Sequence, residues 1–405
     1  MLTNIYFTGA LILFVLSLFL LFYSFSVESE STLRTPVKTH KKELVKRDKI
    51  QDTHINEPDK IRAVYMSQCG AKSPSIRRHI KNLILSTKLN AVVIDIKDYT
   101  GTVSFPTNLK GANTGKGCIV EDMKDFIKDF HKSGIYVIGR ITVFQDPLYA
   151  RAHPNLAVQS KSKKAPWSDW RGLHFIDVGA RDFWKYILKI SREAHQKYYF
   201  DELNYDYIRF PSDGPMSDAE YLWSDYDKRS DELENFFRFI SYNVKVPDRQ
   251  GHVPKISADL FGMVTTNYDD LTIGQILEKA LPYFDYIAPM VYPSHYPKSF
   301  LGLGNPNKHV YTVVHYSMKK AIKRTESSRT KIKSELYKES SQKGIYIKPK
   351  YKKNKLRAWL QDFDYGGNYG VKEVKEQIKA LEDLGLYSYM IWDPANIYTK
   401  GAYLD

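Results

Sequence analysis

Short apolar runs alternate with longer amphipathic segments along the chain from Ile61 onward. The short runs are rich in β-branched residues, a pattern typical of strands that are buried on both faces. A helix opens at Ser73 and Pro74, where an N-cap residue precedes proline in the first turn. Eight strands are predicted at residues 63–66, 90–96, 135–143, 203–210, 255–261, 286–291, 357–363 and 387–392. Further helices are predicted at residues 121–132, 181–197, 217–243, 271–281, 317–326 and 371–384.

The order of these elements predicts the fold class. Strands and helices alternate, which favours a parallel sheet of the α/β class with helices packed on its outer side. Eight such units predict closure into a (β/α)8 barrel of the TIM type over residues 61–405. An open, doubly wound sheet is the alternative, but the first strand–helix turn lacks the Gly-rich phosphate loop of that fold.

The N-terminal segment lies outside this pattern. Residues 5–27 contain no charged residue and are dominated by Leu, Ile, Phe and Val, and this length spans a hydrocarbon core of about 30 Å. No Lys or Arg precedes the run and no A-x-A-like site follows it, so a transmembrane anchor at residues 1–27 is favoured over a cleaved signal. Residues 28–60 are polar without a hydrophobic period and are predicted to be a linker.

The basic residues after the apolar run bear on which side of the membrane the barrel lies. The positive-inside rule would hold this flank in the cytoplasm, but large domains translocate despite flanking charge. We therefore expect a membrane-anchored or exported protein with an extracytoplasmic barrel. The basic residues in question are Lys38, Lys41, Lys42, Lys46 and Arg47.

The net charge of +14 comes mainly from one segment. Residues 319–357 hold 15 Lys and Arg and three Glu, which amounts to +12. Proteins that bind nucleic acid usually spread such charge along a groove with interleaved aromatic residues, so this class is disfavoured. We predict a solvated insertion on the N-terminal face of the barrel, with residues 326–354 exposed and weakly ordered. Binding of an anionic envelope polymer is the alternative role for this Lys-rich insertion.

The two cysteines, Cys69 and Cys118, are too few for a disulfide scaffold or a Cys-based zinc site. They follow the first and second predicted strands, and two free thiols are favoured over a bridge. The sequence holds no CxxC, HExxH, Walker or GxGxxG motif. Because its Asp residues are not grouped with His, no metal is expected, and no cofactor is implied.

Polar residues recur at the ends of the predicted strands. Barrel enzymes place their reacting groups at the C-terminal ends of strands, although a helix-capping Asp explains any single position as well. Carboxylates at successive ends occur together with Arg, Tyr and Trp, which favours one shared site over independent caps. The candidates are Asp95, Asp98, Arg140, Asp206, Arg209, Asp259, Tyr292, Trp359, Asp362, Trp392 and Asp393.

A period of two on the fourth strand places Glu202, Asn204 and Asp206 on one face. If that face points into the barrel, Asp206 lies nearest the substrate and Glu202 lies deep. A buried carboxylate needs a partner, and Arg140 on the neighbouring strand is the predicted one, either as a packing ion pair or as an orienting group.

Four segments resemble a known family. Together they are similar to the glycoside-hydrolase barrel family that was formerly classed as a domain of unknown function. The resemblance runs from about Ile61 to the C-terminus and implies a barrel related to the glycosidases. The Lys-rich insertion departs from the family pattern. The four segments are FDELNYDYIRFPSDG at 200–214, APMVYPSHY at 288–296, RAWLQDF at 357–363 and IWDPAN at 391–396.

Cleavage of a glycosidic bond needs one protonated and one ionised carboxyl group. A neighbouring cation keeps a carboxyl ionised, so Asp206, near Arg209 or Arg140, is predicted to be the nucleophile or charge stabiliser. Asp259 lies among less polar residues, which raise the pKa of a carboxyl, and is predicted to be the acid/base.

The sequence thus predicts a glycoside hydrolase that acts on an envelope or extracellular polysaccharide. The alternative is a non-catalytic glycan-binding or envelope-scaffolding protein on the same barrel. Asp95, Asp98 and Asp362 are the reserve carboxyls. The side chains that either stack on sugar faces or pack in the core are Tyr292, Trp359, Tyr365 and Trp392.

Overall fold

The computed structural model describes residues 54–112, 117–332 and 344–404. The predicted anchor at residues 1–27, and residues 28–53 of the predicted linker, lie outside this part of the chain. Among the described residues, no helix combines the length and the apolar character needed to cross a membrane.

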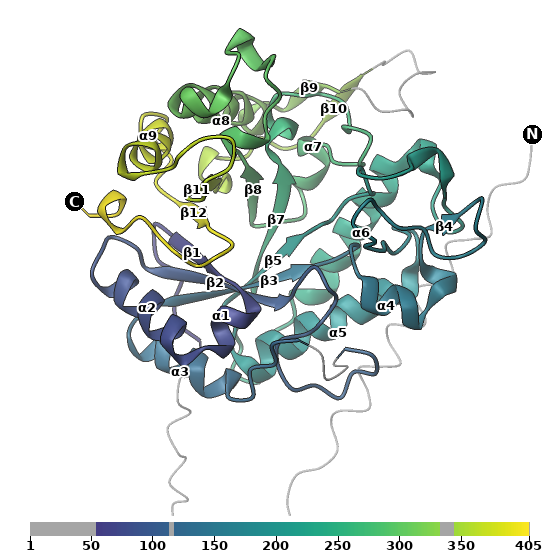
Figure 1. Ribbon diagram of the computed structural model, residues 1–405, viewed down its shortest axis with the longest axis horizontal. Coiled ribbons are helices and arrows are strands. Elements are labelled where there is room, and N and C mark those ends of the chain that lie inside the picture. The colour runs from purple at the N-terminus through teal and green to yellow at the C-terminus, as the bar shows by residue number, and fades with distance from the viewer. Residues whose placement is uncertain (1–53, 113–116, 333–343, 405) are drawn as a thin grey trace, which may run out of the picture. The chain divides into compact units, whose positions relative to one another are not determined.

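Eight parallel strands form a closed barrel, which confirms the predicted (β/α)8 fold (Figure 1). Their order round the barrel is β1, β2, β3, β5, β7, β8, β11 and β12, and β12 pairs with β1 to close it. Because every pair is parallel, the C-terminal ends of the strands meet at one rim. The bounds are β1 Arg62–Met66, β2 Ala91–Lys97, β3 Tyr136–Thr142, β5 Glu202–Asp206, β7 Lys255–Phe261, β8 Tyr286–Met290, β11 Trp359–Gln361 and β12 Tyr389–Trp392.

Helices surround the barrel (Figure 1). Two small antiparallel sheets accompany them, β4 with β6 and β9 with β10. The helices are α1 Gln68–Lys72, α2 Pro74–Leu85, α3 Met123–Lys132, α4 Pro147–Ala152, α5 Arg181–Tyr198, α6 Arg229–Val244, α7 Leu277–Ala280, α8 Val310–Glu326 and α9 Val371–Glu382. The short strands are β4 Gln159–Ser160, β6 Ala219–Glu220, β9 Arg329–Lys331 and β10 Ile345–Ile347.

Alternate residues of each barrel strand face opposite sides of the wall. On β2, Val92 and Ile94 belong to the apolar layer between strands and helices, whereas Ala91 and Val93 belong to a second cluster inside the barrel. This division explains why the strands are apolar almost throughout. The remaining inward position of β2 is Asp95, which lies at the rim and is buried. The interior thus changes from apolar to charged toward the C-terminal rim.

Two predicted helices are shorter than the sequence pattern indicates. Of the predicted helix at 217–243, only residues 229–243 belong to α6, which runs from Arg229 to Val244, and the residues before it form β6 and 3-10 turns. The prediction at 271–281 is confirmed only for α7, residues 277–280. Leu271, Thr272 and Gly274 have φ values of +52°, +58° and +85°, which an α-helix cannot contain.

The Lys-rich insertion is more structured than predicted, and the expectation of an exposed segment is wrong for part of it. Thr330 and Ile332 are buried, and β9 pairs with β10. The Nζ of Lys348 is also buried and donates to the carbonyls of Thr325 at 2.9 Å and Ser327 at 2.6 Å. Residues 333–343 lie outside the described part of the chain.

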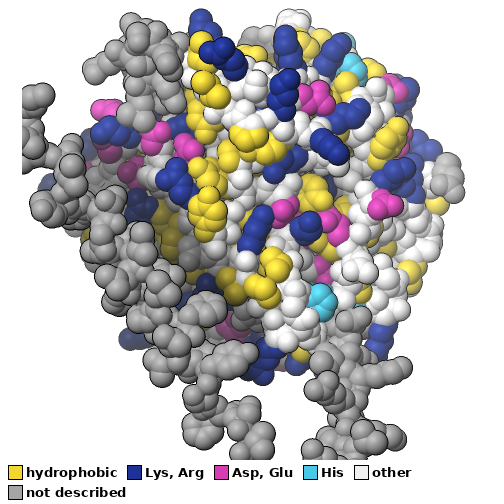
Figure 2. All heavy atoms as spheres, turned by 180° about the vertical axis from the view of Figure 1, so that it is seen from behind, with side chains coloured by type: hydrophobic (Ala, Val, Ile, Leu, Met, Phe, Trp, Pro, Cys, Tyr) yellow, Lys and Arg dark blue, Asp and Glu magenta, His cyan; other side chains and the backbone are white. Residues whose placement is uncertain are grey.

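The charge on the face opposite the view of Figure 1 is dispersed. Figure 2 shows Lys and Arg side chains separated by acidic and hydrophobic ones over this face. The picture agrees with a chain whose charge is nearly balanced outside residues 319–357.

A disulfide joins Cys69 of α1 to Cys118, so the expectation of two free thiols is wrong. The loop that leaves β2 returns along the rim to α1 and brings the two Cα atoms to 4.9 Å, within the range that a bridge requires. Sequence spacing does not reveal this approach, because 49 positions separate the two residues.

Residues 54–60, which the sequence pattern assigned to the linker, lie against the barrel. The backbone N–H of Ile55 donates to Asp201, and its side chain packs on the inner cluster. Glu57 accepts a hydrogen bond from Tyr286 and lies 3.6 Å from the Nζ of Lys255. In the described part of the chain, contacts with the N-terminal face of the barrel are therefore already present in residues 54–60.

Candidate active site

The lowest polar layer inside the barrel is an ion pair between Glu202 and Arg357. Neither side chain is exposed, and Ser257 donates to Glu202 Oε1 at 2.6 Å. Arg140 is not the partner of Glu202, which corrects the sequence-based prediction. Parallel pairing sets Arg140 opposite Asn204, one inward position above Glu202, so Arg357 neutralises the deeper carboxylate instead.

Asp259 lies on β7, one inward position above Ser257, which pairs with Asn204. Its Oδ1 accepts hydrogen bonds from Asn204 Nδ2 and Trp359 Nε1, both at 2.8 Å. Its Oδ2 is buried and has no hydrogen-bond partner, and Arg140 Nε lies 3.9 Å from it. One oxygen of this carboxyl is therefore held by donors while the other is left for a proton.

The upper layer is centred on Arg140. Its Nη1 donates to Asp95 Oδ1 at 2.6 Å, and its Nε and Nη2 donate to Asp206 Oδ2 at 3.1 and 2.5 Å. Asp206 Oδ1 accepts from the backbone N–H of Tyr207 at 2.5 Å, and Asp95 Oδ2 accepts from the hydroxyl of Tyr65 at 2.5 Å. Every oxygen of these two carboxyls thus has a donor, an arrangement that suits carboxylates.

The electrostatics separate Asp259 from its neighbours. Burial raises the pKa of Asp259 well above its usual value, and the nearby charge of Asp206 raises it further, while Arg140 opposes both effects. Burial also raises the pKa of Asp95, against the lowering effect of Arg140. These contacts favour the protonated form of Asp259, next to an Asp206 carboxyl that is paired with Arg140.

The distance between the two carboxyls is bounded by the arginine that contacts both. Arg140 Nε lies 3.1 Å from Asp206 Oδ2 and 3.9 Å from Asp259 Oδ2, so these two oxygens are within about 7 Å, the total of both distances. Glycosidase carboxyl pairs are about 5–5.5 Å apart in retaining enzymes and about 6.5–9.5 Å apart in inverting ones. An upper bound of about 7 Å is compatible with both classes.

Aromatic rings border the carboxyls. Trp392 stacks on Tyr65 with ring centroids 3.8 Å apart and meets Trp359 edge-on at 5.6 Å. The guanidinium of Arg140 lies 4.9 Å from the Trp392 ring centre. Trp359 is almost fully buried, whereas Trp392 is partly exposed. Trp392 is thus the better placed of the two for stacking on a sugar, and Trp359 serves as a hydrogen-bond donor.

Comparison with known families supports the interpretation of this site as that of a glycosidase. Residues 63–398 match the model of a family described as "Putative glycosyl hydrolase domain". The chain belongs to this family. This match confirms the family that the four sequence segments resemble. Together with the closed barrel, it places the chain among the glycosidases.

Solved structures similar to this glycosyl hydrolase family member share its barrel. The glycoside hydrolase domain of PgaB (BpsB) from Bordetella bronchiseptica is 14% identical over 86% of this chain and 99% of its own, with a TM-score of 0.56. Alpha-L-fucosidase isoenzyme 2 from Paenibacillus thiaminolyticus is 12% identical over 85% of this chain and 49% of its own, with a TM-score of 0.53. At such identities the likeness is one of fold. No curated protein matches the chain.

Three predicted carboxyls of this glycosyl hydrolase domain support loops at the rim. Asp98 accepts hydrogen bonds within its own turn, and Asp393 accepts two from the backbone that follows it. Asp362 accepts from the backbone N–H and the hydroxyl of Thr399 and from the hydroxyl of Tyr403. These contacts leave Asp206, Asp259 and Asp95 as the carboxyls joined through Arg140.

Among the remaining predicted residues, Tyr292 belongs to the cluster inside the barrel and is close enough for the charges of Asp259 and Asp206 to act on it. Arg209 is buried and donates to the carbonyl of Phe210 and the hydroxyl of Ser212. Tyr292 is buried, and its pKa is raised by burial and then by the charges of Asp259 and Asp206. Tyr365 is 62% exposed.

Sequence reasoning missed Tyr65 and Asn204 as members of the site. Tyr65 lies in a short apolar strand, and Asn204 was noted only for the face that it shares with Asp206. Both are inward-facing and bind a carboxyl. Both would have been found if the alternation of inward and outward residues had been applied to every strand.

Proposed function

We propose that this chain is a glycoside hydrolase that cleaves an envelope or extracellular polysaccharide at the Asp206–Asp259 rim. Asp259 is the general acid/base, and Asp206 is the nucleophile or the charge stabiliser. The observation that carries the proposal is the contrast between two neighbouring carboxyls, one with its pKa raised by burial and one held by an arginine.

Asp259 is suited to proton donation by its hydrogen bonds. Asn204 and Trp359 both donate to Oδ1, so Oδ1 takes the role of the carbonyl oxygen and Oδ2 carries the proton. A proton on Oδ2 can pass to the oxygen of the leaving sugar, and the resulting carboxylate can then activate water.

Asp206 is suited to meet positive charge at the sugar ring. Arg140 supplies a counter-charge and fixes its orientation through two hydrogen bonds to Oδ2, while Oδ1 accepts a single backbone donor. An ionised carboxylate in this position can attack the anomeric carbon or stabilise an oxocarbenium-like transition state.

Two features support an extracytoplasmic substrate. The predicted anchor at residues 1–27 would tether the barrel to a membrane, and the Cys69–Cys118 disulfide is of the kind that persists in oxidising compartments. An envelope polysaccharide meets both conditions, and the Lys-rich insertion would contact anionic polymer in the same compartment.

The test is a screen of the full chain against envelope and extracellular glycans with detection of new reducing ends. The wild type should release reducing ends from at least one glycan, and Asp206→Asn should not. Measurable glycan binding without any hydrolysis by the wild type would contradict the proposal and favour the glycan-binding alternative.

A further inference from the structure

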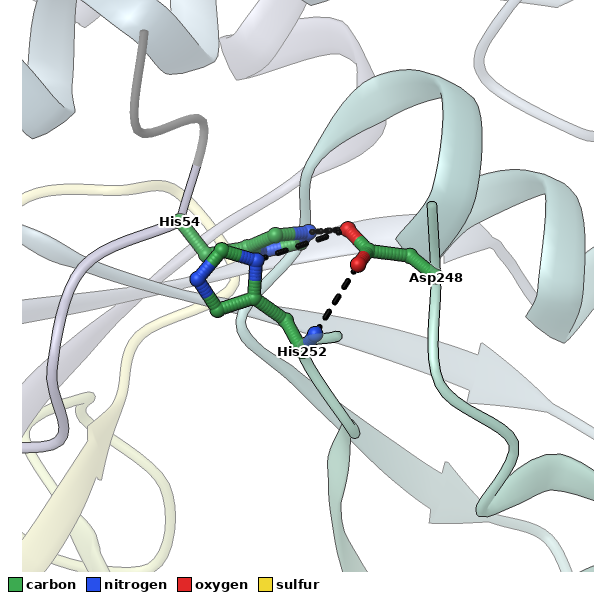
Figure 3. A group of neighbouring side chains, drawn as sticks. All are labelled: His54, Asp248 and His252. Atoms are coloured by element: carbon green, nitrogen blue, oxygen red, sulfur yellow. Dashed lines mark hydrogen bonds and ion pairs between the residues drawn. The ribbon is translucent and has the colours of Figure 1, made fainter. Parts of the chain in front are cut away.

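A second cluster of titratable side chains lies at the opposite, N-terminal end of the barrel (Figure 3). His54 precedes β1, and Asp248 and His252 belong to the loop between α6 and β7. In the part of the chain that the structure describes, these three residues offer ligand atoms that all lie within 4.8 Å of one another. The sequence did not group Asp with His, since 194 positions separate His54 from Asp248.

The loop is shaped to present Asp248. Its Oδ1 accepts from the backbone N–H of Gln250 at 2.8 Å and of His252 at 2.9 Å, and its own N–H donates to the His252 carbonyl at 2.8 Å. Its Oδ2 lies 3.4 Å from His54 Nε2 and 3.5 Å from His252 Nδ1 (Figure 3). The backbone therefore fixes one oxygen and directs the other at both imidazoles.

The imidazole nitrogens are short of partners. His54 is 93% buried, and neither of its ring nitrogens makes a hydrogen bond, nor does the buried Nδ1 of His252. Their contacts with Asp248 at 3.4–3.5 Å are longer than a normal hydrogen bond. Buried polar atoms without partners are costly, so His54 Nε2 and His252 Nδ1, which both face Asp248, are positioned for a further ligand.

Two of the three distances between the ligand atoms match a metal site, and the third is within 4.8 Å. Ligand atoms about 2.0–2.1 Å from a tetrahedral Zn²⁺ lie about 3.3 Å apart. The two distances from Asp248 Oδ2, 3.4 and 3.5 Å, are close to this edge length.

The surroundings of His54 fit the same interpretation. The other ring nitrogen, Nδ1, faces Asp201 Oδ1 at 3.4 Å, and Asp201 is itself held by His131 at 2.9 Å and by the Val137 N–H at 2.9 Å. A carboxylate behind a ligating histidine is a common support of zinc sites, because it sets the tautomer and the ring orientation.

We infer that His54 Nε2, Asp248 Oδ2 and His252 Nδ1 bind one divalent transition-metal ion, with Zn²⁺ as the best match to this donor set. A water on the side of the partly exposed His252 completes the tetrahedron. The metal joins the segment that enters β1 to the α6–β7 loop. Because it lies at the N-terminal end, away from Asp206 and Asp259, it stabilises the fold rather than the reaction.

The test is a calorimetric titration of Zn²⁺ into the full, tag-free chain after treatment with a chelator. The wild type should bind Zn²⁺ saturably at this site. His252→Ala and Asp248→Asn should each weaken that affinity by at least about 100-fold, because loss of supporting groups alone costs 10–100-fold. His79→Ala, which alters an exposed histidine on α2, is the matched control and should leave the affinity unchanged.

A second readout separates binding from folding. All four proteins should unfold at similar temperatures without metal, and Zn²⁺ should raise the Tm of the wild type and His79→Ala but not of the two site variants. Absence of saturable binding by the wild type, or equal affinities in wild type and His252→Ala, would overturn the inference.

Discussion

Asp259 shows how one residue can serve catalysis at the cost of stability. Its folded pKa is raised, chiefly by burial, above an unfolded value of about 3.9. A carboxyl of this kind contributes its full stability below the unfolded pKa and loses it as the pH rises through the folded pKa. At neutral pH the wild type is therefore less stable than it would be with a neutral side chain at position 259.

The first prediction follows from this loss of stability with rising pH. Asp259→Asn keeps the acceptor for Asn204 and Trp359 but cannot ionise, so its Tm should exceed that of the wild type at neutral pH. The difference should shrink as the pH falls below about 3.9, where the Asp259 carboxyl is protonated in the folded and the unfolded chain alike. Thermal unfolding at a series of pH values measures this, and a Tm deficit that is the same at every pH would contradict it.

The residue scale also shows what the sequence could and could not reveal. Asp206 and Asp259 were identifiable because each lies at or near the end of an apolar strand. The partner of Glu202 was not, because the register between strands places Arg357, which is 155 positions away, beside it. Asp362 and Asp393 end strands as well, yet they bind loop groups, which a strand-end position alone does not distinguish.

At the scale of elements, the disulfide fixes the β2 loop against α1. The bridge closes a loop of 49 positions, and such a constraint typically contributes about 2–4 kcal/mol by restricting the unfolded chain. We predict that the Cys69→Ser/Cys118→Ser variant loses about this much free energy of unfolding in denaturant titrations. Reductant should lower the wild type to the same level and leave the variant unchanged. A variant as stable as the oxidised wild type would contradict a stabilising bridge.

The Lys-rich insertion contains one lysine with a structural role. Burial lowers the pKa of Lys348, and its Nζ satisfies the carbonyls of Thr325 and Ser327 at the end of α8. We predict that Lys348→Met costs about 1–3 kcal/mol of unfolding free energy, because it leaves carbonyls without a donor. The exposed Lys350 provides the control, and Lys350→Met should change stability by less than about 0.5 kcal/mol. Equal effects of the two substitutions would show that the insertion is uniformly solvated.

The number and order of the barrel strands followed from periodicity because packing on the barrel agrees with it, although β5 ends at Asp206 and not at residue 210. The predicted helix at 181–197 is α5, Arg181–Tyr198, and the strand at 255–261 is β7 without change. The prediction failed at 271–281, where Leu271 and Thr272 adopt left-handed backbone conformations that apolar periodicity does not encode. The burial of Ile332 depends on the hairpin of β9 and β10, which the charge of the segment concealed.

The whole barrel divides its polar groups between its two ends. The C-terminal rim holds the Arg140 cluster with Asp206 and Asp259, as the rule for barrel enzymes predicts. The interior below it is closed by the Glu202–Arg357 pair. The N-terminal end carries the His54 cluster, where polar groups serve stability. The proposed reaction and the proposed metal thus act at separate ends and can be tested independently.

The most direct test of the central claim compares two leaving groups on the sugar that the glycan screen identifies. One substrate has a leaving group that departs without protonation, and the other has a leaving group that needs a proton. Asp98→Asn is the control, since Asp98 only closes its own turn and its loss should leave turnover near wild type on both substrates.

Turnover by Asp259→Asn should fall about 10²–10⁴-fold on the substrate that needs a proton and return close to wild type on the one that does not. Asp206→Asn should lose turnover on both, because its charge acts at the sugar ring whatever the leaving group. Wild-type turnover by Asp206→Asn, or an equal loss by Asp259→Asn on both substrates, would contradict the assignment of this carboxyl pair.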